Sequence, residues 1–188
     1  MNFKKLAITS TLLVSALFAG NYNVDNDHTN VGFKVKHMMI TNVKGNFKEF
    51  KGTFEYDEKA NTLKALSGEI KVQSINTENK KRDDHLRSAD FFHAEKYPKI
   101  IFNLTKVDGD EAYGDITIKG VTKNIKLDFE AGGSITDPWG KQRAGFTLEG
   151  KIKRKDFGIT WNKVIEAGGV AVGDTVKLEV EVEGILAK

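Results

Sequence analysis

Near the C-terminus the sequence reads Val176-Lys177-Leu178-Glu179-Val180-Glu181-Val182-Glu183. Apolar residues alternate strictly with charged ones along this run. Successive side chains of a β-strand point to opposite faces, so the run predicts a strand with one buried face and one face in water.

The same alternation recurs upstream. It is clearest over residues 31–39, 70–73, 100–104, 116–119, 125–130 and 146–152. Between residues 45 and 56 the frame changes, because Phe47 stands in one register while Phe50 and Phe54 stand in the other. A bulge or bend reconciles the two registers, and Gly52 is suited to such a turn. The pattern predicts about eight strands with a single buried face.

The segments between these strands are short. Turn residues occur at 108–110, 119–120, 132–133, 137–140 and 173–174. Residues 78–88 are highly charged and lack β-branched side chains, which predicts a short surface helix. Antiparallel strands with one buried face either pack as a sandwich or close into a barrel. The interior of an eight-stranded barrel has room for side chains and one small ligand, although the alternation alone favours an ordinary packed core.

The first residues have the anatomy of an export signal. Residues 1–5 form a short basic segment, residues 6–18 are mostly apolar, and Ala19 and Gly20 are small. The apolar run is shorter than the roughly 20 residues that a spanning helix needs. We therefore expect a signal peptide over residues 1–19, a single barrel domain over residues 20–188, and a periplasmic location without stable membrane insertion. The chain has no cysteine, so the core must stabilise the fold without disulfides.

The charge balance bears on the class of partner. The formal net charge is +3, and loss of Lys4 and Lys5 with the signal peptide lowers it to about +1. A nucleic-acid-binding protein needs a clear basic excess, so we expect no nucleic-acid partner.

Catalytic and metal-binding signatures are missing from the sequence. It contains no GxSxG motif, no cysteine nucleophile and no glycine-rich phosphate loop followed by a helix. The four histidines, His28, His37, His85 and His93, show neither HxxxH nor HxH spacing. We therefore predict no enzyme activity, no metal and no cofactor.

Short motifs along nearly the whole chain after residue 21 resemble those of a known family. They lie at residues 22–25, 28–29, 31–37, 45–47, 50–52, 76–77, 82–83, 85–86, 88–92, 97–98, 114–123, 154–159 and 172–176. Ser88-Ala89-Asp90-Phe91-Phe92 and Ile118-Lys119-Gly120-Val121-Thr122 are two of them. Their order and spacing resemble the YceI-like lipid- and polyisoprenoid-binding family.

The resemblance implies an all-β fold, an eight-stranded antiparallel lipocalin-like β-barrel, to which the charged segment adds one short helix. It further implies a long apolar tunnel inside the barrel that holds a long-chain isoprenoid, a quinone or a fatty-acid derivative. Dimers are common in the family, so a homodimer is also expected. The residues that we assign to the tunnel on this basis are Phe33, Val35, Phe54, Ile70, Phe102, Leu104, Ile116, Ile118, Phe129, Phe146, Leu148, Leu178 and Val180.

Polar residues in the same motifs have two interpretations. His37 shares the frame of Phe33 and Val35, so it is either a core histidine satisfied by one hydrogen bond or a contact to the polar end of the ligand. Asp25, His28, Arg82, Asp83 and His85 could form one buried network at a barrel end and orient a head group, which places Arg82 and Asp83 among the predicted ligand contacts. Alternatively, the helical residues among them form a solvated face.

Three functions follow from these observations. The first is a periplasmic carrier that holds a long apolar lipid and performs no catalysis. The second is a solid-cored barrel whose surface binds another protein. The third, which the missing motifs disfavour, is a metal-dependent enzyme that uses the histidines and aspartates.

Overall fold

The computed structural model describes residues 19–165 and 169–188, so the predicted signal peptide lies outside the described residues apart from Ala19. The strands are β1 (Gly20–Val24), β2 (Asn30–His37), β3 (Thr41–Phe47), β4 (Phe50–Asp57), β5 (Thr62–Lys71), β6 (Ile75–Asn76), β7 (Lys99–Asp108), β8 (Glu111–Ile118), β9 (Val121–Thr136), β10 (Gln142–Lys153) and β11 (Val172–Leu186). The helices are α1 (Lys80–Arg87) and the short 3-10 helices η1 (Val72–Ser74) and η2 (Arg154–Phe157).

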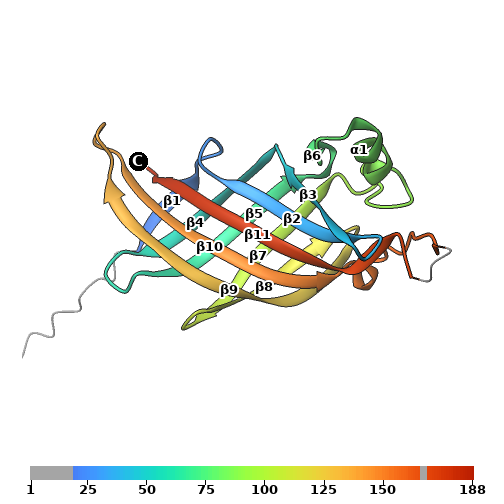
Figure 1. Cartoon of the computed structure of the whole chain (residues 1–188). Coiled ribbons are helices and arrows are strands. Elements are labelled where there is room, and N and C mark those ends of the chain that lie inside the picture. The colour runs from blue at the N-terminus through green and yellow to red at the C-terminus, as the bar shows by residue number, and fades with distance from the viewer. Residues whose placement is uncertain (1–18, 166–168) are drawn as a thin grey trace, which may run out of the picture.

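The strands form a closed antiparallel barrel (Figure 1). Hydrogen-bonded neighbours follow the order β1-β4-β5-β7-β8-β9-β10-β11, and β11 pairs with β1 to close the ring. β2 continues the line of β1 along β11, and β3 continues the line of β4 along β2. With these two pairs counted as single strands, the barrel has eight, and the predicted eight-stranded barrel with one short helix is confirmed.

Both composite strands are interrupted at the same level of the barrel wall. Residues 25–29 separate β1 from β2, and Lys48 and Glu49 separate β3 from β4. The Lys48 N–H donates to the Ser74 carbonyl (3.1 Å) and the Lys71 N–H donates to the Glu49 carbonyl (2.9 Å), so the backbone stays paired across the break. This break is the change of frame expected between residues 45 and 56. It precedes Phe50 instead of falling at Gly52, which pairs with Gly68 inside the β4–β5 ladder.

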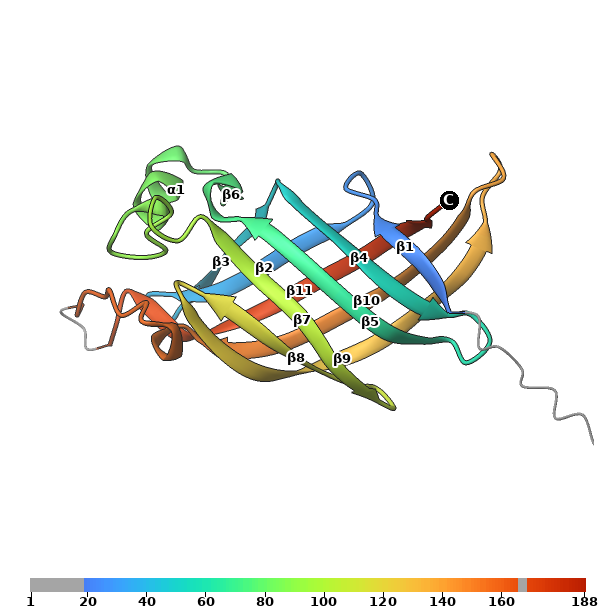
Figure 2. The same ribbon diagram turned by 180° about the vertical axis from the view of Figure 1, so that it is seen from behind.

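The short helix lies at one end of the barrel (Figures 1 and 2). The side chain of Asn79 accepts a hydrogen bond from the Arg82 N–H (3.0 Å) and caps the helix N-terminus. The guanidinium of Arg87 donates to the carbonyls of Gln73 and Ile75, each at 2.8 Å. These bonds hold α1 against η1 and β6, so the predicted surface helix is anchored to the barrel rim.

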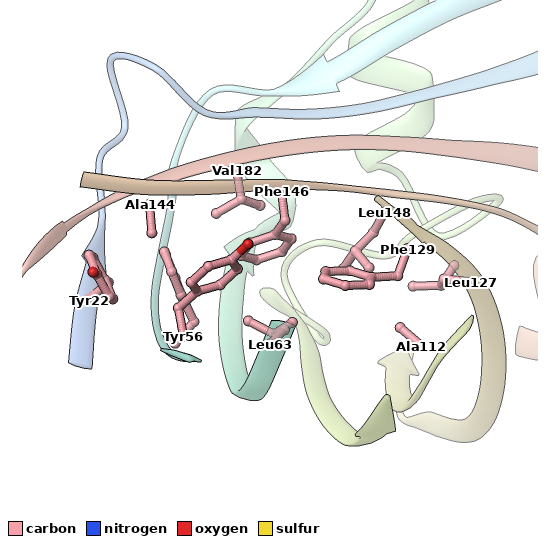
Figure 3. Close-up of a cluster of buried hydrophobic side chains, with 11 residues drawn as sticks. Tyr22, Tyr56, Leu63, Ala112, Leu127, Phe129, Ala144, Phe146, Leu148 and Val182 are labelled. Atoms are coloured by element: carbon pink, nitrogen blue, oxygen red, sulfur yellow. The ribbon is translucent and has the colours of Figure 1, made fainter. Parts of the chain in front are cut away.

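The barrel interior contains two clusters of buried apolar side chains. The cluster near the C-terminal end of β11 includes five aromatic residues that we call the aromatic plug: Tyr22, Phe54, Tyr56, Phe129 and Phe146 (Figure 3). Tyr22 and Phe54 stack with ring centroids 5.1 Å apart, and Phe146 meets Phe54 edge-on at the same distance. The second cluster lies at the α1 end and includes Phe47, Ile75, Phe91, Phe157 and Ile159.

Candidate functional site: an apolar cavity inside the barrel

A cavity of about 210 Å³ lies inside the barrel and borders both clusters. A single buried water needs only about 10–15 Å³, so the space is large, and nearly all of its wall is apolar. Large apolar cavities of this kind stay dry and bind apolar molecules. The geometry therefore suits a hydrophobic ligand.

Two facing glycines help to create this space. Gly52 in β4 is paired with Gly68 in β5, and both stand in the inward frame of their strands. A Cβ added at Gly68 would meet no atom within 4 Å, whereas one at Gly52 would come within 2.8 Å of the Ser67 carbonyl oxygen. The volume that a side chain at position 68 would fill is thus left open inside the barrel.

Arg154 is a buried cation on the cavity wall, and its donors are already engaged. Its guanidinium donates to the carbonyls of Ile159 and Trp161 (both 2.8 Å) and Gly173 (3.0 Å), and it lies 3.2 Å from the carboxylate of Asp174. Burial lowers the pKa of this guanidinium from its ordinary value. With its side chain only 4 % exposed, Arg154 binds the segment after η2 to the start of β11 and offers little to a ligand.

Aromatic residues cover the α1 end of the cavity. Leu86, Phe91 and Phe92 reach the cavity from α1 and the loop after it. The rings of His85, Phe91 and Trp161 form a mutual cluster with centroids 4.9–5.1 Å apart, which joins α1 to the segment after η2. Trp161 is not among the predicted site residues, because its contribution depends on this contact between distant segments.

The predicted tunnel residues divide into two groups. The structure places Phe33, Val35, Ile70, Phe102, Ile116, Ile118, Leu148, Leu178 and Val180 on the cavity wall. Phe54, Phe129 and Phe146 point inward as expected but belong to the aromatic plug, and Leu104 packs against the same cluster. These four residues close one end of the barrel instead of lining the open space.

The three predicted polar contacts lie off the cavity wall. His37 is the last residue of β2 and pairs with Thr41 and Val172 at the barrel rim. Arg82 donates to the hydroxyl (2.7 Å) and carbonyl (2.8 Å) of Thr77, and the Asp83 carboxylate accepts from the N–H (2.9 Å) and hydroxyl (2.5 Å) of the same residue. Arg82 and Asp83 thus position α1, and none of the three reaches the cavity.

The expected single network of five polar residues is not formed. Asp25 and His28 contact each other at 3.0 Å, whereas His85 contacts Asp90 at 2.9 Å and Arg82 and Asp83 contact Thr77. The sequence places the residues in separate motifs, and the barrel keeps them apart.

Asp25 instead belongs to a cluster that the sequence did not predict. Arg143 lies 2.7 Å from the carboxylates of both Asp25 and Asp137 and also donates to Glu183. Burial alone would raise the pKa of Asp25, but hydrogen bonds from Arg143 and His28 outweigh it and lower that pKa. The bond from Arg143 likewise lowers the pKa of Asp137.

Three residues at this cluster, Asp25, His28 and Glu183, are of types that can bind a metal ion. Ligand atoms of Asp25, His28 and Glu183 lie within 4.8 Å of one another. The guanidinium of Arg143 already bonds both carboxylates, so the positive charge that such a group requires is supplied by the chain itself.

Several cavity residues were missing from the sequence prediction. Ile100, Leu66 and Val31 stand in the same inward frames as predicted neighbours, and alternation could have found them. Arg154, the first residue of η2, continues the even-numbered inward frame of Leu148 and Ile152 in β10, which is a signal that it points inward. Arg143 carries no local signal, because its partners lie up to 118 residues away. No helix among the described residues has the length and apolar character to cross a membrane.

Comparison with known proteins agrees with this architecture. The model of the YceI-like domain matches residues 22–184. Protein YceI of Escherichia coli O157:H7 is 44 % identical over 147 residues, which cover 75 % of this chain and 77 % of that protein. A crystal structure of the Campylobacter jejuni YceI protein has a TM-score of 0.70 at 42 % identity and covers 87 % of this chain and 96 % of its own.

A more distant solved structure shares the fold. A polyisoprenoid-binding domain from Saccharophagus degradans has a TM-score of 0.66 at 12 % identity, with coverage of 90 % of this chain and 100 % of that domain. The family model, the relatives and the resemblance in the sequence motifs agree. The chain therefore belongs to the YceI-like family.

Proposed function

We propose that this protein holds one long apolar lipid, an isoprenoid, quinone or fatty-acid derivative, inside its barrel and carries it through the periplasm. The observation that supports this most is the cavity of about 210 Å³ with an almost wholly apolar wall. The name of the Saccharophagus degradans relative, a polyisoprenoid-binding domain, points to the same class of ligand.

The energetics suit a carrier. Burial of about 500 Å² of apolar ligand surface contributes roughly 12 kcal/mol. Association costs of about 4–15 kcal/mol offset much of this, and a preformed rigid barrel keeps them toward the lower end. The resulting affinity is moderate and selects weakly for chain length, which allows the ligand to be taken up and released.

The cavity wall also supports a role without catalysis. The charged residues of the wall already have partners within the protein. Arg154 donates its hydrogen bonds to backbone carbonyls, and Lys51 and Glu69 contact each other at 3.5 Å. General acid–base catalysis requires a titratable group within reach of the substrate. The second candidate, a solid-cored barrel that binds another protein, fits the open cavity less well.

Native mass spectrometry of the mature protein from its own periplasm, followed by organic extraction, tests the proposal. One long-chain molecule for each barrel is the expected result and would name the ligand class. A protein recovered without any lipid would favour the interaction protein, and a mass offset equal to a metal ion would favour the enzyme.

A further inference from the structure

The turn between β2 and β3 presents large apolar side chains to solvent. We call residues His37-Met38-Met39-Ile40 the methionine turn. Met38, Met39 and Ile40 are 43 %, 54 % and 83 % exposed, and Val164, which is 85 % exposed, lies in the segment between η2 and β11. A hypothetical Cβ on Gly169 of that segment would lie 4.0 Å from Met39 Cγ, so the segment and the turn are neighbours. A group of exposed apolar residues on a folded protein marks an interaction site.

The backbone of this turn is strained as well as apolar. Met38 and Met39 have φ angles of +48° and +62°, in the left-handed region that residues with a Cβ avoid. A tight turn with positive φ at two successive residues is normally made by Asn-Gly or a similar pair. The Ile40 N–H donates to the His37 carbonyl (3.1 Å) and the Met38 N–H donates to the Ala171 carbonyl (2.9 Å), which holds the turn in place. Strained backbone of this kind is often kept at functional sites, which points to a function for the two methionines.

The methionine turn lies at the barrel end that the cavity reaches. Val35, two residues before His37, lines the cavity, as does Val172, which pairs with His37. Both views of the barrel place the β2–β3 connection at the same end as the segment before β11 (Figures 1 and 2). An apolar chain that leaves the cavity toward this end would therefore emerge beside the exposed apolar residues.

Three lysines lie near these apolar residues along the chain. Lys36 and Lys44 flank the turn in β2 and β3, and Lys163 precedes Val164. All three are exposed, and the structure records no ion pair for them among the residues that it describes. Exposed apolar side chains with lysines nearby are suited to the surface of an anionic bilayer, where the side chains enter the acyl boundary and the ammonium groups meet the head groups.

We propose that the methionine turn, with Val164 and the flanking lysines, docks this barrel onto an anionic lipid bilayer, from which the apolar chain passes into the cavity. The inference rests on the proposed function, because it supplies the source of the ligand. The docking surface is small, one hairpin tip with Val164 and the lysines beside it, so docking is reversible and sensitive to salt.

A matched pair of variants tests the proposal. Ile40→Asp removes an exposed apolar side chain from the methionine turn, and Ile135→Asp removes one that is 65 % exposed from the β9–β10 hairpin, at the plugged end. The measurement is sedimentation of the full mature protein with vesicles of phosphatidylethanolamine and phosphatidylglycerol. We expect Ile40→Asp to weaken vesicle binding by about tenfold, whereas Ile135→Asp binds as the wild type does. Lys36→Glu and raised salt should also weaken binding.

The docking proposal is overturned if the wild-type protein stays in the supernatant, or if the two variants lose vesicle binding equally. It is also overturned if the wild type is a dimer in solution that Ile40→Asp converts to a monomer, because the turn would then bind a second copy of the chain. Loading from detergent solution with farnesol separates this result from the proposed function. Ile40→Asp is expected to take up farnesol as the wild type does. If neither protein takes up farnesol, the lipid-carrier function is contradicted. The vesicle sedimentation still tests membrane docking independently.

Discussion

The ring of Phe102 lies across Gly114 of the neighbouring strand, so closely that a Cβ at Gly114 would come within 2.3 Å of Phe102 Cζ. Phe102 also lines the cavity. The absence of a side chain at position 114 therefore determines where this ring lies and how much of the cavity it leaves open.

Gly114→Ala is expected to destabilise the protein by about 1–3 kcal/mol, because the new methyl group must displace the ring. The urea midpoint measures this loss, and the displaced ring should also lower lipid occupancy. Gly68→Ala is the matched control, since its added Cβ meets no atom within 4 Å. Equal midpoints for the two variants would contradict the packing described above.

Gly68→Leu should close the cavity without unfolding the barrel. The side chain enters space that is empty in the structure, so the melting temperature should stay the same or rise. Native mass spectrometry should then find the protein without its long-chain ligand. Full occupancy in this variant would show that the chain does not run past position 68.

Phe102→Asp is expected to abolish chain binding, because a carboxylate on the cavity wall cannot be desolvated cheaply. His37→Ala should leave binding nearly unchanged, because His37 lies at the rim and off the wall. Lipid extraction from both purified variants, with circular dichroism as the check on folding, makes the comparison. Loss of lipid in His37→Ala alone would make His37 a contact of the ligand's polar end.

Arg154→Met is expected to cost about 3 kcal/mol or more, because it leaves several buried carbonyl groups without a donor. Arg154→Lys should recover little of the loss, since an ammonium has three donors and cannot reproduce the planar fork of a guanidinium. Hydrogen exchange should localise the change to the segment between η2 and β11. Unchanged protection there would mean that Arg154 does not organise this segment.

The cluster around Arg143 predicts how stability depends on pH. The pKa values of Asp25 and Asp137 are lower in the folded protein than in the unfolded chain, so their contribution is present above about pH 4 and is lost as the pH falls through the folded-state values. At pH 7 the wild-type protein should have a larger free energy of unfolding than the Arg143→Met variant. The difference between the two should shrink toward pH 2. A difference that stays constant with pH would separate this cluster from acid denaturation.

Alternation predicted strands with one buried face, because it reports directly which face of a strand is buried; the choice of a barrel over a sandwich came from the family resemblance. Alternation does not report depth along the barrel axis, which is why Phe54 and Phe146 were assigned to the tunnel although they form the aromatic plug. Alternation likewise does not report where a strand ends: His37 continues the inward frame but is the last residue of β2, and it is absent from the cavity wall.

Long-range polar contacts were the least predictable part of the site. Asp25 contacts Arg143 only because β1 and β10 both lie beside β11. The sequence near either residue gives no signal of this contact. Arg82 and Asp83 were read as ligand contacts from a shared motif, whereas their local geometry directs both toward Thr77.

The closure of the barrel between β1 and β11 determines when its interior can form during synthesis. The first strand pairs with the last one, and the Ala187 N–H donates to the Asn21 carbonyl at 2.7 Å. A chain that emerges N-terminus first therefore presents an open, incomplete wall until its final residues arrive. The interior is enclosed only once β11 has been made and has paired with β1, so a product truncated before β11 would lack the closed cavity as well as being unstable.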